Sequence, residues 1–561
     1  MDGNIALLFA AHLAQPARAL YRHHAGGTWR DVTVADIARE IGRWQAAFRR
    51  EGLQRGDRVA LCVRNGPSWV AIDLAALGLG LVVVPLYVDD NAENVAWCVA
   101  HAEAKLLVAE TSRIADNLRR VPGANLPPIV VLRPDAGEMG VTGGTPAGAA
   151  AADWLPAAAP PPVVEPLPLD TLATICFTSG TSGRPKGVML SHGNILANVE
   201  SCRQTGMARV EDVFLSVLPL SHMFERTGGY YLPLALGAKV AHCRGIAQIA
   251  EDLASQAPTV FFAVPRIFER FGAKIAESLA ASPVKRALFH QCVSRGYRMA
   301  SGKASLLDRI AVPALRAMVA KKVLARLGGR LRLTVVGGAA LDPEIAQTFI
   351  GLGLPMLQGY GMTEASPVIS VNRDDDNVPE SVGPPLPGVE VMLGEGGELL
   401  ARGANIMLGY WRNPEASRAA LDGGWLHTGD IAQIEDGKIF IRGRAKDILV
   451  LSNGEKLPPQ DVEFAILHDP VFEQVMLVGE GRPYPVLLAV TRETDAEALE
   501  RRANARLSGF PRWVRIRRVI PVADVWSVEN GLLTPTLKLK RPLLQQRYRH
   551  EIAAAYTEST K

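Results

Sequence analysis

Thr178-Ser179-Gly180-Thr181-Ser182-Gly183-Arg184-Pro185-Lys186-Gly187 is the stretch that decides how the rest of this chain is interpreted. Its ten residues include three glycines, four hydroxyls and two cations. Glycine lets backbone N–H groups approach an anion, hydroxyls add donors, and a lysine supplies a mobile counter-charge. An apolar run at 172–177 precedes the stretch, and Ser191 behind it predicts the N-cap of a helix over 192–201. A strand that leads into such a loop indicates polyphosphate binding more than an ordinary surface turn.

The loop differs from the two commonest nucleotide motifs. Lys186 follows Pro185 and precedes Gly187, whereas a P-loop ends in Gly-Lys-Ser/Thr. Further on, Gly359-Tyr360-Gly361 has Glu364 where a dinucleotide fingerprint needs its third glycine. The sequence therefore disfavours both a P-loop NTPase and a dinucleotide-binding fold.

Helix and strand patterns alternate along most of the chain. Thr33 and Asp36 predict a capped helix that ends near Gly52, and Asp342-Pro343 predicts the start of another. Apolar runs predict strands at 58–63, 331–336 and 356–358. Such alternation is typical of parallel or mixed α/β sheets.

The length of 561 residues exceeds what one hydrophobic core supports. We predict an α/β protein in which residues 1–444 form a large N-terminal domain of mixed α/β sheets packed with helices. Residues 445–561 are predicted to form a small C-terminal α/β domain. The strands predicted in this small domain are 448–451, 475–478 and 486–490.

Two further motifs carry residues that suit nucleotide chemistry. Thr363 and Glu364 follow the strand at 356–358, where a hydroxyl can bind a phosphoryl oxygen and a carboxylate can hold Mg²⁺. Asp430 follows Thr428-Gly429, which predicts a tight turn before a strand at 431–434. A carboxylate in that position can accept two ribose hydroxyl hydrogen bonds.

These motifs, in this order, resemble the signature of the adenylate-forming, or AMP-binding, superfamily. That superfamily includes acyl-CoA synthetases, nonribosomal-peptide adenylation domains and beetle luciferases. Ser182 stands where the family usually has a second threonine, a change that keeps the hydroxyl. The tail from Thr534 to Arg541 resembles the last family motif, with Leu537 where the family often has glycine. The resemblance covers about residues 29–541.

The resemblance implies a role for each motif residue. Tyr360 would stack on adenine, Thr363 would contact the α-phosphate, and Asp430, with Arg444 as its partner, would anchor the ribose. Glu364 would hold Mg²⁺. The residues implied in nucleotide binding are Thr178, Ser179, Gly180, Thr181, Ser182, Gly183, Lys186, Gly338, Ala339, Gly359, Tyr360, Gly361, Thr363, Asp430, Arg444 and Lys446.

Catalysis in the family needs a lysine near the reacting groups. The resemblance places this lysine at Lys538, between the substrate carboxylate and the α-phosphate, with Lys540 as the alternative. It also implies that the small C-terminal domain is mobile and rotates about a hinge at Lys446, with Asp447 as the alternative. The residues implied in catalysis are Lys538, Lys186, Thr363, Glu364 and His222.

The segments 218–226, which includes His222, and 258–269 resemble long-chain acyl-CoA synthetases. No Asp lies between Leu218 and Ala241 to meet a cationic substrate. The apolar partners that suit an aliphatic or aromatic acid are Met223, Phe224, Tyr230 and Tyr231. The implied activity is ATP-dependent synthesis of an acyl-CoA from a medium- or long-chain acid through acyl-AMP, with Mg²⁺ and with coenzyme A as co-substrate. The alternatives are a fatty acyl-AMP ligase that loads a carrier protein and a catalytically inactive binding paralogue.

The bulk composition bounds the partners and the location. A net charge of +4 is too small to indicate nucleic-acid binding, and the sequence carries no signal of oligomeric state. The N-terminus lacks the basic segment of a signal peptide, and the six cysteines include no close pair, which is typical of the reducing cytoplasm. The alternation of arginines with apolar residues over 512–518 predicts a strand with one solvent-exposed face. Its alternative is attraction of coenzyme A phosphates or of an anionic membrane, which leaves peripheral contact at the inner membrane face open.

Overall fold

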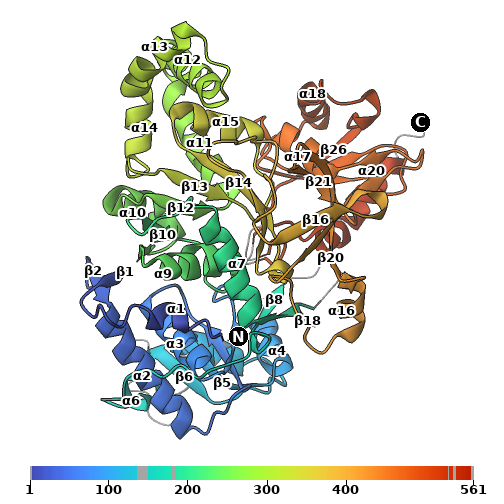
Figure 1. Cartoon of the computed structure of the whole chain (residues 1–561). Coiled ribbons are helices and arrows are strands. Elements are labelled where there is room, and N and C mark those ends of the chain that lie inside the picture. Colours follow the sequence, from blue (N-terminus) through green and yellow to red (C-terminus); the bar gives the residue numbers. More distant parts are fainter. Residues whose placement is uncertain (1–2, 135–148, 179–183, 528–529, 535–537, 558–561) are drawn as a thin grey trace.

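The computed structural model describes residues 3–134, 149–178, 184–527, 530–534 and 538–557 (Figure 1). A large lobe, the described residues up to 444, holds two eight-stranded sheets and a five-stranded sheet with helices around them. The C-terminal lobe, the described residues from 445 onward, is a smaller α/β assembly on one side of it. The predicted α/β fold class is confirmed.

The first sheet of the large lobe has the strand order β15-β14-β13-β12-β10-β11-β1-β2. Its interior pairs are parallel, and only the two outermost pairs, β15 with β14 and β1 with β2, are antiparallel. Its strands are β1 Ala19–Ala25, β2 Thr28–Thr33, β10 Val213–Ser216, β11 Lys239–His242, β12 Val260–Ala263, β13 Leu333–Val336, β14 Met356–Gly361 and β15 Val368–Val371. The central strands β10, β12 and β13 are short, mostly apolar runs that are almost entirely buried, as strands covered on both faces require.

The second sheet has the order β18-β9-β8-β4-β3-β5-β6-β7. Its strands are β3 Arg58–Cys62, β4 Val82–Pro85, β5 Ala104–Thr111, β6 Ile129–Arg133, β7 Ala149–Ala150, β8 Leu172–Thr178, β9 Lys186–Ser191 and β18 Gly409–Tyr410. β8 and β9 are antiparallel, with Thr178 opposite Lys186, so the predicted phosphate loop connects the two strands of a hairpin. Ser179–Gly183, five of the predicted binding residues, lie outside the described residues.

Several helices begin where the sequence predicts. α7, His192–Gln204, starts with a capping box between Ser191 and Asn194. α2, Val34–Arg50, has the predicted box between Thr33 and Asp36. α3, Pro67–Gly78, and α15, Pro343–Leu352, both have proline in the first turn, and α15 is capped by Asp342. The shorter helices are α1 Leu7–Ala10, α4 Ala92–His101, α5 Ser112–Arg119, α6 Ala151–Trp154, α8 Met223–Glu225, α9 Leu232–Leu236, α10 Ile249–Gln256 and α16 Pro414–Ala420.

A helical projection is inserted between β12 and β13. It consists of α11 Pro265–Ala280, α12 Pro283–Ala300, α13 Leu306–Leu315, the π-helical turn η4 Arg316–Ala320 and α14 Lys321–Ala325. α12 packs on α15, and the tip of the projection, with α12 and α13, stands clear of the sheets at the top of Figure 1.

The third sheet contains β16 Val389–Leu393, β17 Glu398–Gly403, β19 Leu421–Asp422, β20 Trp425–Glu435 and β21 Lys438–Arg444. The predicted turn at Thr428-Gly429 is wrong, because β20 runs through it. Gly429 has φ 72°, and the register against β17 shifts there, so the strand bulges and continues. Asp430 stands on this bulged strand directly opposite Arg444.

The C-terminal lobe has a three-stranded sheet, β24 Gln474–Val478, β25 Val486–Val490 and β26 Arg518–Val522, and a small hairpin of β22 Leu449–Val450 and β23 Lys456–Leu457. Its helices are α17 Pro459–Leu467, α18 Ala496–Arg506, α19 Arg541–Arg547 and α20 Arg549–Thr557. The predicted strand at 512–518 is wrong: residues Arg512–Val514 form a 3₁₀ turn and β26 begins only at Arg518. Val514 and Ile516 are buried between exposed arginines, and this alternation produced the strand-like pattern.

An ion pair joins the two lobes. His468, at the C-terminal end of α17, places Nε2 2.7 Å from Oδ2 of Asp342 and 3.4 Å from Oε2 of Glu344, at the start of α15. The Asp342 carboxylate raises the pKa of His468 to about 9, so the imidazole is charged at neutral pH. Among the described residues, no helix combines the length and apolar composition that crossing a bilayer requires.

Candidate active site

A cleft of about 2910 Å³ lies where the two lobes meet, and residues of both line its walls. Every predicted site residue that the structure describes lines this cleft. These residues are Thr178, Lys186, His222, Gly338, Ala339, Gly359, Tyr360, Gly361, Thr363, Glu364, Asp430, Arg444, Lys446 and Lys538. The alternatives Lys540 and Asp447 line it as well, so lining alone does not choose between them and the predicted residues.

Asp430 is the centre of a three-residue polar cluster. The Tyr360 hydroxyl, from the end of β14, donates to Oδ2 of Asp430 at 2.5 Å. On the other side, Nε of Arg444 lies 3.3 Å from Oδ1. Burial raises the pKa of Asp430, while the charge of Arg444 and the Tyr360 hydrogen bond oppose this rise. The cluster holds a carboxylate in fixed orientation, as recognition of a sugar diol requires.

Glu364 and Lys186 meet at a residue that sequence reasoning missed. The Tyr410 hydroxyl, in β18, donates to Oε1 of Glu364 at 2.8 Å, and Nζ of Lys186 lies 5.0 Å from the centroid of the Tyr410 ring. This is a cation–π distance. Tyr410 pairs with Val188 of β9, which brings it beside the start of that strand. The local sequence around Tyr410 carries no chemical pattern, so only the pairing of β18 with β9 reveals its place.

The residues present fit a magnesium ion supplied with a nucleotide. No group of three or more His, Cys, Asp or Glu side chains in the described part of the chain could enclose a metal by itself. Glu364 contributes one carboxylate, fixed through Oε1 by Tyr410, and its Oε2 is the second oxygen. Mg²⁺ is commonly held by one or two carboxylates together with substrate phosphates and water.

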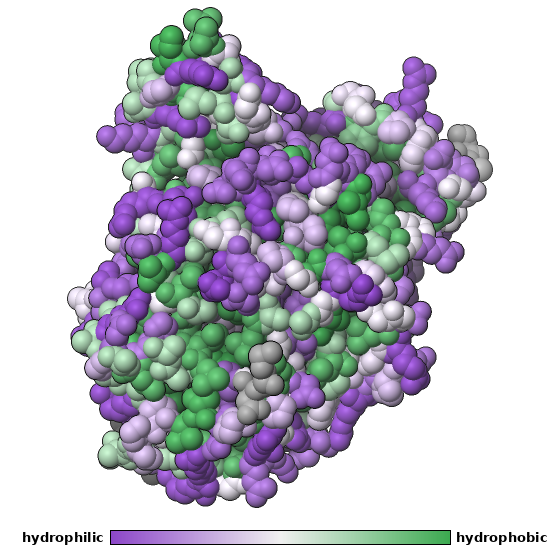
Figure 2. Space-filling view, viewed as in Figure 1, coloured by the Kyte–Doolittle hydropathy of each residue, from purple (hydrophilic) through white to green (hydrophobic). Residues whose placement is uncertain are grey.

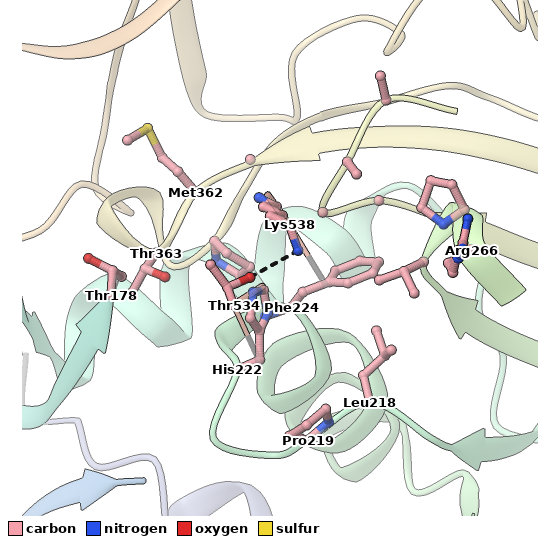
Figure 3. Close-up of a pocket in the computed structure, with 18 of the residues that line it drawn as sticks. Thr178, Leu218, Pro219, His222, Phe224, Arg266, Met362, Thr363, Thr534 and Lys538 are labelled. Atoms are coloured by element: carbon pink, nitrogen blue, oxygen red, sulfur yellow. Dashed lines mark hydrogen bonds between the residues drawn. The ribbon is translucent and has the colours of Figure 1, made fainter. Parts of the chain in front are cut away.

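Lys538 enters the cleft from the C-terminal lobe (Figure 3). Its backbone N–H donates to the Thr534 hydroxyl at 3.0 Å, and the Thr534 N–H donates to its carbonyl at 2.9 Å. The crowding of protein atoms, followed by the charge of Arg444, lowers the pKa of the Lys538 ammonium, while Asp430 and Glu364 oppose that change. Because the side chain keeps contact with the solvent of the cleft, these charges are partly screened.

His222 lies near Lys538 and is held in one tautomer. It caps α8, and Nδ1 accepts the Phe224 N–H at 3.2 Å. Burial and the charge of Lys538 lower the pKa of His222 to about 4. A neutral imidazole carries one proton, so an accepting Nδ1 leaves that proton on Nε2 as a donor.

Apolar side chains line the cleft around His222. Leu218, Pro219 and Phe224 lie beside it, and Arg266 at the start of α11 lies farther along the wall (Figure 3). Phe224 packs edge-on against Phe262 with ring centroids 5.6 Å apart. Close packing against this ring requires a small residue at Gly228, where a Cβ atom would approach Phe262 within 2.7 Å.

The prediction that Met223, Tyr230 and Tyr231 contribute to the acid pocket is wrong. All three are buried in the core, and both tyrosine hydroxyls donate to the carboxylate of Asp73, at 3.2 and 2.8 Å. Arg226 completes this buried group with an ion pair to Asp73 at 2.5 Å. The tyrosines therefore satisfy a buried charge pair and do not face a substrate.

Two family models match this chain. A model described as AMP-binding enzyme matches residues 10–411, and one described as AMP-binding enzyme C-terminal domain matches residues 446–560. The protein therefore belongs to the AMP-binding, adenylate-forming enzymes, as the motifs predicted.

Curated relatives align along nearly the whole chain. Long-chain-fatty-acid–CoA ligase FadD15 of Mycobacterium bovis is 30% identical, with 99% of this chain and 97% of that protein covered. Peroxisomal long chain acyl-CoA synthetase 7 of Arabidopsis thaliana is 31% identical, with 95% and 82% covered. Human long-chain-fatty-acid–CoA ligase 1 is 30% identical, with 93% and 82% covered.

Solved structures share the fold at lower sequence identity. The anthranilate CoA ligase AuaEII in complex with anthranoyl-AMP superposes with a TM-score of 0.77 at 20% identity, covering 99% of this chain and 98% of that one. ATP-bound MatB from Rhodopseudomonas palustris gives a TM-score of 0.74 at 23% identity, covering 98% and 99%. Both likenesses support the two-lobed architecture described above.

Proposed function

We propose that this protein is an acyl-CoA synthetase that activates a medium- or long-chain fatty acid, or a related apolar acid, as acyl-AMP and then forms the coenzyme A thioester. The class, an AMP-forming acid–thiol ligase, follows from the family and from relatives named as long-chain-fatty-acid–CoA ligases. One observation carries the proposal: a single cleft gathers Lys186, Glu364, Asp430 and Lys538, drawn from two sheets of the large lobe, a turn beside them and the C-terminal lobe.

In the first half-reaction, a carboxylate oxygen of the acid attacks the α-phosphorus of ATP and pyrophosphate leaves. No general base is needed, because a carboxylic acid is already ionised at pH 7. The obstacle is repulsion between the anionic acid and the triphosphate, so catalysis consists mainly of positioning and placing positive charge. Lys538 supplies that charge between carboxylate and α-phosphate, and Lys186 supplies it at the triphosphate. Bound through Glu364, Mg²⁺ would neutralise charge on the phosphate oxygens.

The remaining site residues orient the reactants. Asp430 accepts the ribose hydroxyls while Tyr360 and Arg444 fix its carboxylate, and Tyr360 also offers its ring to adenine. His222 donates from Nε2 to an oxygen of the bound acid, and it stays neutral throughout the physiological pH range. In the second half-reaction, the thiol of coenzyme A attacks the acyl carbon of acyl-AMP and AMP leaves.

Lys538→Ala tests the first half-reaction directly. We expect acid-dependent exchange between ATP and pyrophosphate to fall by roughly a hundredfold or more, the loss typical when one transition-state contact is removed. Thioester formation from supplied acyl-AMP should survive. Lys540→Ala is the matched control and should leave exchange intact; the opposite pattern would transfer the role to Lys540.

A panel of acids of graded length separates this activity from its rivals. Each acid is assayed with coenzyme A and with a carrier protein that bears phosphopantetheine. Turnover with coenzyme A supports the proposal, turnover with the carrier alone indicates a fatty acyl-AMP ligase, and no adenylation of any acid indicates an inactive paralogue.

The domain assignment is part of the same proposal. We place the boundary between residues 444 and 445 and the hinge at Lys446, about which the C-terminal domain rotates between the half-reactions. Lys446 and Asp447 lie in the turn after β21, and the family model of the C-terminal domain begins at Lys446, whereas the model of the large domain ends at Trp411. We also propose a cytoplasmic location, with peripheral contact at the inner membrane face as an addition; cell fractionation tests both.

A further inference from the structure

The tip of the helical projection exposes apolar side chains to an unusual degree. Among the described residues, five large hydrophobic side chains are more than 65% exposed, and four of them are Val284, Leu306, Leu307 and Ile310. Leu306, Leu307 and Ile310 form what we call the apolar tip, and they are neighbours at helical spacing on α13. Figure 2 shows hydrophobic side chains gathered at the same place, over α12 and α13. Contiguous apolar surface of this kind marks a contact site on a protein.

The same segment concentrates positive charge. Residues 281–330 contain eleven Lys and Arg and a single acid, Asp308, which gives a net charge of +10. The whole chain carries only +4, so the other residues together carry −6. Asp308 is buried and paired with Arg295 and Arg298, at 3.2 and 2.7 Å, so it offers little negative charge to an approaching partner. The exposed basic residues of this segment include Lys303 and Arg309, which lie beside the apolar tip in the sequence, and Lys321 and Lys322 farther along the projection.

We infer that this projection is a docking surface for an anionic phospholipid bilayer. The apolar tip would enter the headgroup region, and the surrounding lysines and arginines would contact lipid phosphates, the combination typical of interfacial helices. A second copy of this chain is a poor occupant, because two faces of charge +10 would repel each other. A nucleic acid or free phosphate would satisfy the basic residues but leave Leu306, Leu307 and Ile310 in water.

The position of α11 connects this surface to the cleft. Its first residues, including Pro265, Arg266 and Ile267, line the cleft, and its last residue lies just before α12. A helix of 16 residues spans about 24 Å. The chain passes from the cleft through α11 and α12 to the apolar tip, whose neighbour Asp308 pairs with Arg298 near the end of α12. Docking would therefore hold the cleft no farther than about the combined length of these two helices from a bilayer in which long-chain acids accumulate. This benefit rests on the proposed function, whereas the docking itself does not.

Flotation with vesicles tests the docking without requiring turnover. We use vesicles of equal parts phosphatidylglycerol and phosphatidylcholine, and vesicles of phosphatidylcholine alone. The wild-type chain should float with the anionic vesicles and far less with the neutral ones. The triple variant Leu306→Gln, Leu307→Gln, Ile310→Gln should bind at least about tenfold more weakly, because each apolar side chain loses its transfer into lipid. Since all three are exposed, its melting temperature should match the wild type.

Charge is tested separately. Lys303→Gln, Arg309→Gln and Lys322→Gln together should weaken binding to anionic vesicles by at least about twentyfold, since Lys303 and Arg309 lie beside the apolar tip in the sequence and each cation near such a surface contributes a factor of about five. The matched comparison removes the same charge at the exposed Arg512, Arg515 and Arg517, the other segment whose arginines could attract an anionic membrane, and should leave binding unchanged if the projection is the docking surface.

Three results would overturn the inference. The wild-type chain could fail to float with anionic vesicles, the two triple variants could float as well as it does, or the control could lose as much binding as the charge variant. A change of the apolar variant from dimer to monomer, without any effect on vesicles, would instead identify a self-association face. If the wild-type chain floats with anionic vesicles but makes no acyl-CoA, that result would count against the proposed function and leave the docking intact.

Discussion

At the scale of single residues, Tyr410 is the point at which two distant motifs meet. Its hydroxyl fixes the Glu364 carboxylate and its ring faces the ammonium of Lys186. Both partners were predicted from motifs, because loops and strand ends of recognisable composition carry them. Tyr410 could not be predicted, since an aromatic residue between Gly409 and Trp411 is compatible with many environments until β18 is paired with β9.

Glu364→Gln should raise the Mg²⁺ concentration needed for half-maximal activity at least about tenfold, a loss seen even for groups that only support a metal ligand. The change keeps the shape of the side chain and removes its charge. Titration of exchange activity with Mg²⁺ measures it. Tyr410→Phe keeps the carboxylate and should shift the titration less; an unchanged titration in Glu364→Gln would argue against the magnesium role.

Tyr360→Phe should raise the KM for ATP about tenfold, because Asp430 loses a hydrogen bond to a charged group. The ring remains available to adenine, so kcat should change much less. Steady-state kinetics with varied ATP measures the split. Tyr484→Phe removes a hydroxyl in the C-terminal lobe and serves as control. A KM that stays at the wild-type value would separate Tyr360 from ribose recognition.

At the scale of helices and strands, predictions succeeded where the signal is local. The caps at Thr33, Ser191 and Asp342 depend on residues within one turn, and all three helices begin there. The predictions failed where an alternating pattern or a glycine is compatible with more than one backbone conformation. Buried Val514 and Ile516 alternate with arginines without forming a strand, and Gly429 bulges a strand that the sequence indicated would only begin after it.

Ser191→Ala should lower the free energy of unfolding by about 1 kcal/mol, the usual value of an N-cap. Ser191 accepts the Asn194 N–H at 3.0 Å and donates its own N–H to Asn194 at 2.9 Å, so the variant leaves one buried donor of α7 unsatisfied. Urea denaturation measures the loss. Ser278→Ala, at an exposed site on α11, should stay within about 0.5 kcal/mol of the wild type. Equal effects of both changes would contradict the importance of the cap.

At the scale of the whole molecule, the arrangement of the lobes depends on contacts that no local pattern reveals. His468 and Asp342 lie far apart in the sequence, and nothing near either residue indicates the other. The motifs did predict that a C-terminal lysine reaches the nucleotide side, but only through a resemblance. Burial of Tyr230 and Tyr231 beside Asp73 was missed, because aromatic residues look alike in sequence whether they face a pocket or a core.

The ion pair between the lobes predicts a pH dependence. Asp342 raises the pKa of His468 to about 9. The pair therefore stabilises the contact between the lobes fully below the ordinary histidine pKa of about 6.5, and this stabilisation is lost as the pH rises through about 9. The charged pair holds the C-terminal lobe, which carries Lys538, against the large lobe. His468→Gln should therefore slow exchange several-fold at pH 6.5, where the pair is intact in the wild type, and should match the wild type above pH 9. Exchange rates measured across this range test it, with exposed His550→Gln as control. A constant ratio of variant to wild type would refute the linkage.

The late position of Lys538 has a consequence for protein synthesis. Most of the cleft, including Glu364 and Asp430, can assemble before the ribosome has translated the codon for this lysine. On the proposed assignment, a nascent or truncated chain would hold ATP without consuming it. A premature stop codon shortly before position 538 would then yield a protein that binds ATP without turning it over, rather than an enzyme of reduced activity.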